Sequence, residues 1–285
     1  SRQIMAQQLS EKQPGGDLSD EIGKLLISAA VLKCDANDGV TDGVIDDPRH
    51  CDFDPAALQC KTGQTTGCLK PEEVKRAKWL YGPAQTKQGL KLYPGPAFGA
   101  PPSTSLPGVD PRHPGDSAIA LMLQQTPTWT VATFDPDKDI PALVQRFDAD
   151  LGATNADLSA FKARGGKLIL YHGWADQLLS PFNSIDYYDS VTKKMGPAQT
   201  DSFLRLFMVP GMQHCAGGPG PNEFDAVDAV VKWVEHDEAP AQMVARHITA
   251  GKIDRTRPLC VYPQVAKYKG AGNTDEAASF ACAAL

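Results

Sequence analysis

The chain has 285 residues, enough for one large domain or for a core with a sizeable insertion. Its 34 acidic residues outnumber its 28 basic ones, and the net charge of −6 argues against a nucleic-acid-binding protein, which would carry a basic face. No run of about 18 apolar residues is present, so the sequence predicts no membrane-spanning helix.

The first predicted element is an amphipathic helix over residues 17–32. Leu18, Ile22, Leu25 and Leu26 recur at the spacing that places them on one helical face. We expect this face to pack against the body of the protein.

An acidic loop follows, with the sequence CDANDGVTDGVIDD over residues 34–47. Its five aspartates, with no Lys or Arg among them, are Asp35, Asp38, Asp42, Asp46 and Asp47. Their carboxylates would repel one another, and a calcium ion, which takes oxygen ligands, would relieve that repulsion. Gly39 and Gly43 would let the loop wrap around an ion. The spacing differs from the EF-hand pattern, and a solvated acidic turn is the alternative.

Seven cysteines are present, and none lies in a zinc-binding spacing. Their polar, Gly- and Pro-rich surroundings favour disulfides in an oxidising compartment, with buried free thiols as the alternative. Six cysteines admit fifteen pairings. The simplest scheme joins sequence neighbours: Cys34–Cys51, Cys60–Cys68 and Cys260–Cys282. Cys215 is then left without a partner.

The middle of the chain, up to about residue 150, is rich in Pro, Gly, Asp and Cys and predicts few strands. One helix is predicted over residues 69–82, with Pro71 near its start and Gly82 after it. Residues 93–116 predict mostly loop. We interpret this region as a cap or insertion tied by disulfides. Three aromatic residues could line a pocket there, although ordinary core packing is the stronger interpretation: Phe98, Trp129 and Phe134.

The last part of the chain predicts alternating helices and strands. A short helix over residues 157–164 precedes an apolar strand over 167–171, and a second buried strand covers 203–209. Between the strands we expect a helix that begins with Ser180 as N-cap and Pro181 as its first residue. This order predicts a parallel sheet covered by helices, the α/β class.

A further helix is predicted over residues 222–238. Acidic residues in its first turn suit the positive end of the helix dipole: Glu223 and Asp225. Four valines share one face and are expected to face the core: Val227, Val230, Val231 and Val234.

Asp176 and His214 each follow directly on one of the two predicted strands. Catalytic groups collect at the carboxyl ends of parallel strands, and the order Asp then His matches the end of a Ser-Asp-His hydrolase triad. In that role, His214 would accept the serine proton and Asp176 would orient the imidazole. The alternatives are a structural histidine and a helix-capping aspartate. His172 is the rival base, but its place at a strand end fits packing better.

The nucleophile is missing from this interpretation. The G-x-S-x-G pattern of an α/β-hydrolase elbow does not occur in the chain, and Ser1 is followed by Gln3 where a glycine is needed. The residues alone therefore give a base and an acid without a nucleophile.

Five stretches together resemble the tannase and feruloyl esterase family, and the resemblance runs from about Leu18 to the end of the chain. They are CDANDGVTDGVIDDPRHCDFDPAALQC, RGGKLILYHGWAD, VPGMQHCAGGPG, RPLCVYPQVAKYKG and the final FACAAL. The resemblance implies an α/β-hydrolase core carrying a large, disulfide-stapled lid. Residues 1–17 would then be a remnant of the core after the nucleophile elbow, 18–150 the lid, and 151–285 the C-terminal half of the core.

The resemblance also implies site residues. Asp176 matches the family's catalytic acid and His214 its general base. A structural calcium ion in the lid would be held by two kinds of oxygen: the carboxylates of Asp35, Asp38 and Asp42, and the backbone carbonyls of Val40 and Val44. Asp46 matches a further acidic position.

Cys215 would be bridged, by the same resemblance, to a cysteine just before the nucleophilic serine. Arg2 and Gln3 match the helix that follows the elbow, so the serine and that cysteine are expected a few residues before Ser1. A strand and a loop that the family carries after this helix have almost no counterpart here, and the lid is short after Tyr93.

We therefore expect a secreted or periplasmic serine esterase that hydrolyses small esters of aromatic acids, such as feruloyl or galloyl esters. Its cofactor would be structural calcium, its nucleophile would lie on an upstream segment or chain, and no nucleic-acid or membrane partner is expected. The alternative is a non-catalytic, calcium-binding and disulfide-stapled module, or a degenerate homologue that binds a ligand or partner.

Overall fold

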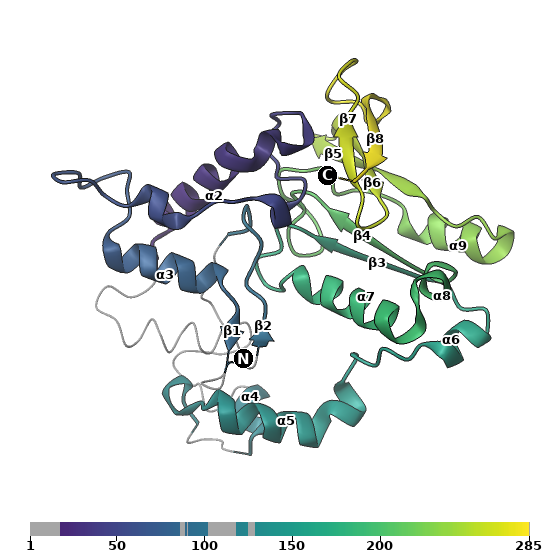
Figure 1. Cartoon of the computed structure of the whole chain (residues 1–285), viewed down its shortest axis with the longest axis horizontal. Coiled ribbons are helices and arrows are strands. Elements are labelled where there is room, and N and C mark those ends of the chain that lie inside the picture. The colour runs from purple at the N-terminus through teal and green to yellow at the C-terminus, as the bar shows by residue number, and fades with distance from the viewer. Residues whose placement is uncertain (1–17, 86–88, 90, 102–117, 125–128, 285) are drawn as a thin grey trace.

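The computed structural model describes residues 18–85, 89, 91–101, 118–124 and 129–284, so the predicted remnant over residues 1–17 lies outside it. The chain has a mixed α/β structure (Figure 1). Its α-helices are α2 (Asp20–Cys34), α3 (Pro71–Tyr81), α4 (Ala118–Met122), α5 (Pro136–Leu151), α6 (Ser159–Ala163), α7 (Phe182–Met195), α8 (Pro197–Asp201) and α9 (Ala226–His236). Its strands are β1 (Ala84–Gln85), β2 (Lys91–Tyr93), β3 (Leu168–Gly173), β4 (Leu204–Val209), β5 (Gln242–Thr249), β6 (Lys252–Cys260), β7 (Val265–Tyr268) and β8 (Phe280–Ala283).

Strands β3 and β4 form a parallel pair in the middle of the molecule, with a register that runs from Leu168↔Leu204 to Gly173↔Val209. Successive side chains of a strand face opposite sides. On one side, Leu206 and Met208 pack with Ile185 of α7. On the other side, a second cluster joins the pair to α9: Ile169, Phe207, Val209, Ala226 and Ala229. Helices thus cover both faces, which confirms the predicted α/β class.

Two antiparallel hairpins follow α9, and sequence analysis did not predict them. Strand β5 pairs with β6, and β7 pairs with β8. The end of β6 reaches the parallel pair, because the Tyr262 N–H donates to the Leu206 carbonyl at 2.8 Å. The sequences of the hairpin strands mix Lys, Arg, Thr and Gln with apolar residues, so they lack the apolar runs that predicted β3 and β4.

The N-terminal helices α2 and α3 form a second core of their own, at the left of Figure 1. Leu26 and Ala30 of α2 pack with Leu69, and Val74 and Ala77 of α3 join them, all buried. These two helices confirm the prediction for residues 17–32 and 69–82, with ends shifted by one to three residues.

Three details differ from the predictions. Ser180 does not cap α7, because its hydroxyl donates instead to the Gly95 carbonyl at 2.6 Å. Residues 136–151, expected within a loop-rich region, form α5, in which Pro136 occupies the first turn and the Asp135 side chain caps the amides. The third concerns α9.

The valine face of α9 is not buried among the described residues. Val227 is 71% exposed and Val234 is 58% exposed, whereas Trp233 is the buried residue of this helix. Helix α9 begins at Ala226, so Asp225 is its N-cap, and Glu223 lies before the helix and pairs with Arg246 through the backbone. The periodic pattern correctly predicted a helix but not the elements that would cover its valines.

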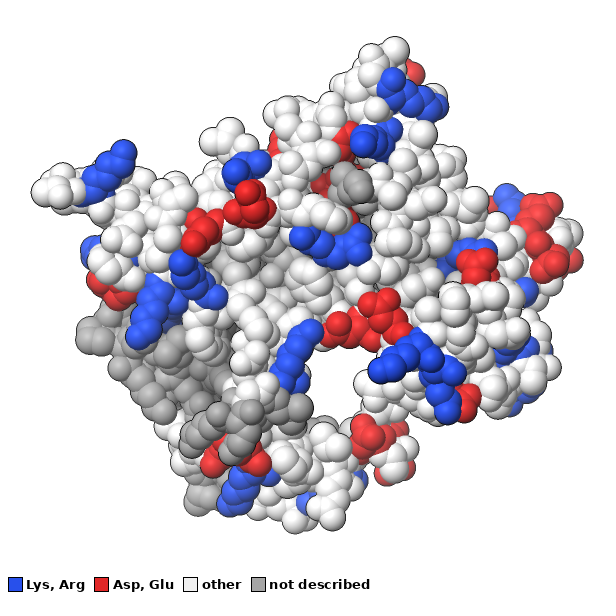
Figure 2. Space-filling model, viewed as in Figure 1, with Lys and Arg blue, Asp and Glu red and all other residues white. Residues whose placement is uncertain are grey.

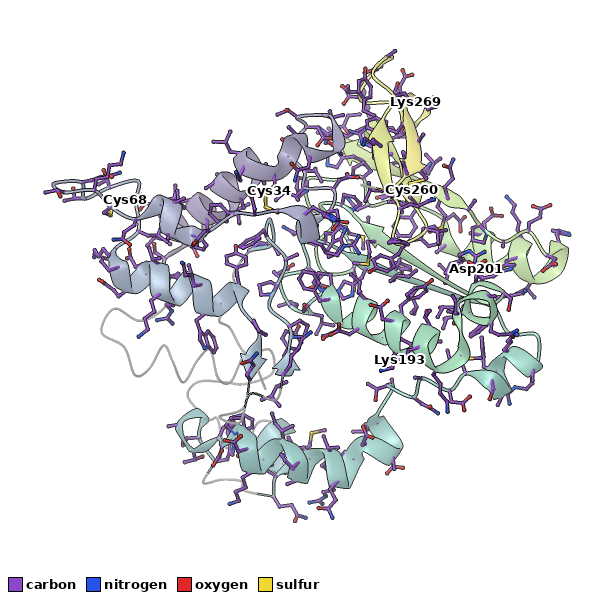
Figure 3. All side chains as sticks on the ribbon, viewed as in Figure 1. Cys34, Cys68, Lys193, Asp201, Cys260 and Lys269 are labelled. Carbon is purple, nitrogen blue, oxygen red and sulfur yellow. A yellow bond between two sulfur atoms is a disulfide. The ribbon has the colours of Figure 1, made fainter. Side chains whose placement is uncertain are left out.

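Three disulfides join sequence neighbours, and Figure 3 shows them at the labelled Cys34, Cys68 and Cys260. They are Cys34–Cys51, Cys60–Cys68 and Cys260–Cys282. The surface seen in Figure 2 carries basic and acidic side chains interspersed, without a basic face. No helix among the described residues combines the length and the apolar character that crossing a bilayer requires.

The Cys34–Cys51 disulfide closes a loop across 17 residues and anchors the acidic loop to α2. Replacing both cysteines by alanine is expected to lower the free energy of unfolding by about 3 kcal/mol, because the unfolded chain regains the entropy of loop closure. Denaturant unfolding under non-reducing conditions measures the change. A double variant that unfolds at the wild-type midpoint would contradict this expectation.

Candidate active site

The site forms where β3 and β4 end side by side. The Trp174 N–H donates to the Val209 carbonyl and the Ala175 N–H donates to the Met212 carbonyl, both at 2.9 Å. These bonds join the segment after β3 to the segment after β4. Gly173 permits the approach, because a Cβ there would lie 2.2 Å from the Met212 carbonyl oxygen. Two loops far apart in sequence are therefore held together.

Asp176 and His214 meet at this junction. The Asp176 Oδ2 atom lies 2.9 Å from Nδ1 of His214, which is the distance of a charge-assisted hydrogen bond. The carboxylate is buried, with 4% of its side chain exposed, whereas 35% of the imidazole is exposed. No hydrogen bond to Nε2 of His214 is found within the part of the chain that the structure describes, so this nitrogen is free for an incoming group.

Backbone amides hold the other oxygen of the carboxylate. The N–H groups of Leu178 and Leu179 both donate to Oδ1 of Asp176 at 2.8 Å. Gln177 adds a link to the partner loop, because its side-chain oxygen accepts from the His214 N–H at 3.3 Å. Sequence analysis missed Gln177, since nothing local to a glutamine marks a contact 37 positions away.

The pKa of Asp176 lies below the ordinary carboxyl value. Burial alone would raise this pKa, but hydrogen bonds from His172, the Leu179 N–H, His214 and the Leu178 N–H outweigh burial and lower it. Asp176 is therefore a carboxylate at neutral pH, and as a pure acceptor it requires a proton on Nδ1 of His214. Nε2 then has the free lone pair that a general base needs.

His172, the rival base, contacts the same carboxylate. Its Nε2 atom lies 3.2 Å from Oδ2 of Asp176 and its Nδ1 atom lies 2.7 Å from the hydroxyl of Ser184 in α7. Both ring nitrogens have partners, so His172 has no free nitrogen for a substrate proton. Of these two histidines, His214 is the one with a ring nitrogen left to act as a base.

Cys215, next to His214, is a free and exposed thiol. Its backbone has a φ of 63°, which is unusual for a residue other than glycine. No disulfide to Cys215 is formed by the residues that the structure describes. Its predicted bridge to an upstream cysteine remains a prediction.

The acidic loop, the candidate metal site, is largely occupied by internal contacts. The Asp35 carboxylate accepts from the amides of Asp42 and Gly43 at 3.0 and 2.9 Å. Asp42 pairs with the guanidinium groups of Arg255 and Arg257, which follow it by more than 200 positions. Across residues 18–284, leaving out the stretches not described, no group of three or more His, Cys, Asp or Glu side chains is arranged to hold a metal ion.

Two buried aspartates of this loop nevertheless lie where the ionised form of a carboxyl group is disfavoured. Burial, with contributions from Asp42 and Asp35, raises the pKa of Asp38 to about 6, although the Val40 N–H and Arg257 oppose the change. Burial also raises the pKa of Asp46 well above the ordinary value, and Asp38 adds to this. One oxygen of Asp46 is buried without a hydrogen-bond partner among the described residues. Such an oxygen fits a hard cation.

The aromatic residues proposed as pocket walls are packed in cores. Trp129 and Phe134 are buried, and Phe98 lies against the rings of Phe53 and Tyr81, with centroids 5.4 and 4.9 Å apart. Phe98 also lines a small cavity that reaches Trp174 and Ala175, next to the site. Of the three, it is therefore the one near the Asp176 loop.

An ionised Asp and a correctly protonated His at the ends of adjacent parallel strands define the class of site found in α/β hydrolases that use a Ser-His-Asp triad. The family model for tannase and feruloyl esterase matches residues 7–108 and 115–283. The chain belongs to this family.

Curated relatives and solved structures agree with this assignment. The chain is 37% identical over 311 residues to mono(2-hydroxyethyl) terephthalate hydrolase of Piscinibacter sakaiensis, covering 91% of the chain and 51% of that protein. It is 37% identical over 275 residues to a probable feruloyl esterase of Arthroderma benhamiae, covering 90% and 51%. The crystal structure of feruloyl esterase B from Aspergillus oryzae superposes with a TM-score of 0.86 at 25% identity, covering 99% of the chain and 61% of that structure. The chain thus spans about half the length of these curated relatives.

The lowered pKa of Asp176 predicts a pH-dependent contribution to stability. Because the folded-state value lies below the unfolded value of about 4, the contribution is present above about pH 4 and is lost as the pH falls below it. The difference in unfolding free energy between wild type and Asp176→Asn should therefore shrink from about pH 5 to about pH 3. Denaturant titrations at several pH values measure it, with the exposed Asp52→Asn as control. A difference that stays constant over this range would contradict the prediction.

Proposed function

We propose that the chain supplies the acid and the base of a serine carboxylic ester hydrolase, and the observation that carries this is the hydrogen bond between Asp176 and His214. The serine would come from a segment outside this chain, before Ser1. Two facts support that placement: the chain has no G-x-S-x-G pattern, and its relatives are about twice its length.

In this reaction, the serine hydroxyl attacks the ester carbonyl while Nε2 of His214 accepts its proton. The imidazolium then donates that proton to the departing alcohol, which leaves an acyl-enzyme. Water then attacks the acyl-enzyme while His214 accepts a proton from that water, and the imidazolium returns the proton to the serine oxygen as the acid is released. Asp176 keeps the imidazole in the required tautomer and stabilises its positive charge in both steps.

Esters of aromatic acids are the proposed substrates. The support comes from the names of the relatives, which specify feruloyl and terephthalate esters. Three disulfides fit a secreted or periplasmic protein. We retain the division into a lid over residues 18–150 and half of a hydrolase core over 151–285 as part of this proposal.

Replacing His214 by alanine tests the proposed base. In the full-length protein that carries the serine, hydrolysis of methyl ferulate should fall on the order of 10⁴-fold, because the variant lacks the group proposed to accept the serine proton. His247→Ala is the matched control, since His247 also pairs with an aspartate, Asp254, but on the exposed β5–β6 hairpin. A His214→Ala variant that retains activity would exclude the proposed base. A wild-type protein without any esterase activity would favour the non-catalytic binding module instead.

We also propose that calcium binds the acidic loop as a structural ion. Carboxylates of Asp35, Asp38 and Asp42 and carbonyls of Val40 and Val44 would hold it. Two observations support this proposal. Asp46 has a buried oxygen without a hydrogen-bond partner in the described part of the chain, which could be a ligand, and Asp42 and Asp35 lie close enough to Asp38 to raise its pKa, a repulsion that a divalent cation would offset. The arginine pairs of Asp42 already supply part of the counter-charge.

Removing calcium with a chelator should lower the melting temperature, since an ion bound only to the folded state stabilises it by mass action. Differential scanning fluorimetry with chelator, then with calcium restored, measures the effect, and magnesium serves as the control ion. An unchanged melting temperature would mean that Arg255 and Arg257 alone compensate the loop.

A further inference from the structure

One oxygen of Asp176 is shared by two imidazole rings. Oδ2 lies 2.9 Å from Nδ1 of His214 and 3.2 Å from Nε2 of His172. His172 belongs to β3 itself, on the side of the strand that faces α7, and Ser184 in α7 contacts its other nitrogen at 2.7 Å. A chain of three polar contacts therefore runs from α7 through His172 and Asp176 to the candidate base.

We propose that His172 is a positioning residue: its Nε2–H holds Oδ2 of Asp176 toward His214, and Ser184 fixes the His172 ring. The inference rests on the proposed esterase function, in which Asp176 must orient His214. The proposed reaction itself gives no role to His172.

The protons in this chain follow from the charge of Asp176. An ionised carboxylate only accepts, so both nitrogens that face it carry hydrogen: Nε2 of His172 and Nδ1 of His214. In the neutral His172 ring, Nδ1 is then an acceptor, and the Ser184 hydroxyl donates to it. Ser184 thereby selects the tautomer of His172 that can donate to Asp176.

The four donors on Asp176 divide evenly between its oxygens. Oδ1 accepts from the amides of Leu178 and Leu179, and Oδ2 accepts from His172 and His214. Three of these donors come from the β3 strand and the loop that follows it, and only His214 comes from the other loop. Without His172, no residue of that side within the described part of the chain would donate to Oδ2, and the carboxylate could rotate about its bond to Cβ.

Burial separates the roles of the two histidines. The side chain of His172 is 13% exposed, whereas that of His214 is 35% exposed, so solvent and ligands reach His214 more easily. The start of α7 is also held near the site, because Phe182 packs edge-on against Trp174 with ring centroids 5.6 Å apart. Ser184 is thus fixed by packing, and it can in turn fix the His172 ring.

The direct test is the NMR signal of the His214 ring N–H in this chain, which needs no enzymatic activity. Hydrogen-bonded to a fixed carboxylate, this proton should exchange slowly and give a resolved resonance. His172→Phe should broaden or abolish the resonance, Ser184→Ala should weaken it, and His172→Gln should retain it, because the glutamine amide can replace the Nε2–H donor. Ser190→Ala is the matched control on α7, since its hydroxyl donates to the Tyr187 carbonyl within the same helix.

A resonance that persists unchanged in His172→Phe and Ser184→Ala, at wild-type melting temperature, would overturn the inference. If His172→Phe fails to fold, the outcome depends on the two milder variants: loss in Ser184→Ala with retention in His172→Gln supports the role, and an unchanged signal in Ser184→Ala excludes it.

Kinetics of the full-length protein provide a second measurement. Loss of an orienting contact typically costs about 10- to 100-fold, so kcat should fall by this factor in His172→Phe with KM little changed, and His172→Gln should recover most of it. Full activity of His172→Phe would overturn the inference while leaving the esterase function intact. No hydrolysis by wild type, with the NMR effects present, would exclude the esterase function but not the positioning by His172.

Discussion

The hydrogen bond from His214 to Asp176 depends on the parallel pairing of β3 and β4. Because Gly173 and Val209 are register partners, the two strands end together, and the loops that follow them begin at the same edge of the sheet. The absence of a side chain on Gly173 lets these loops touch. The candidate site is thus a consequence of strand register, and the helices on both faces serve to keep that register.

Asp176 shows how a buried charge is kept ionised. Desolvation would favour the neutral acid, but four donors around the carboxylate reverse that preference. The acidic loop shows the opposite balance, because Asp38 and Asp46 are buried with fewer donors and with like charges nearby. The protein's own donors therefore stabilise the ionised form of Asp176, whereas the surroundings of Asp38 and Asp46 favour the protonated form.

The two halves of the chain are stabilised by different means. The parallel pair has an apolar core on each face, which a continuous run of apolar residues can build. The region around α2 and α3 has a core of its own and adds two disulfides. Contacts such as Asp42 with Arg257 join the acidic loop to the C-terminal hairpins, so the N-terminal and C-terminal parts of the chain pack against each other here.

The sequence by itself determined the elements whose signal is local. Apolar runs predicted β3 and β4, the 3.6-residue period predicted α2, α3 and α9, and the order of Asp176 and His214 after two strands predicted that they would meet. The long motifs also identified the family. The helices and strands depend on residues within one element, where the chain's own periodicity carries the information. The contact between Asp176 and His214 spans 38 positions and was predictable because parallel strands end at the same edge of a sheet.

Only the tertiary structure decided the contacts between distant positions. Three contacts show this: Asp42 pairs with Arg257, His172 contacts Asp176, and Ser180 donates to the Gly95 carbonyl instead of capping a helix. Each involves residue types that have several equally good local partners. The sequence did not predict α5, because the prolines in that segment are typical of loops. The exposure of the α9 valines depends on which elements cover them. Hydrogen bonds and burial are decided by which surfaces approach one another in space, and no local pattern in a single sequence records that approach.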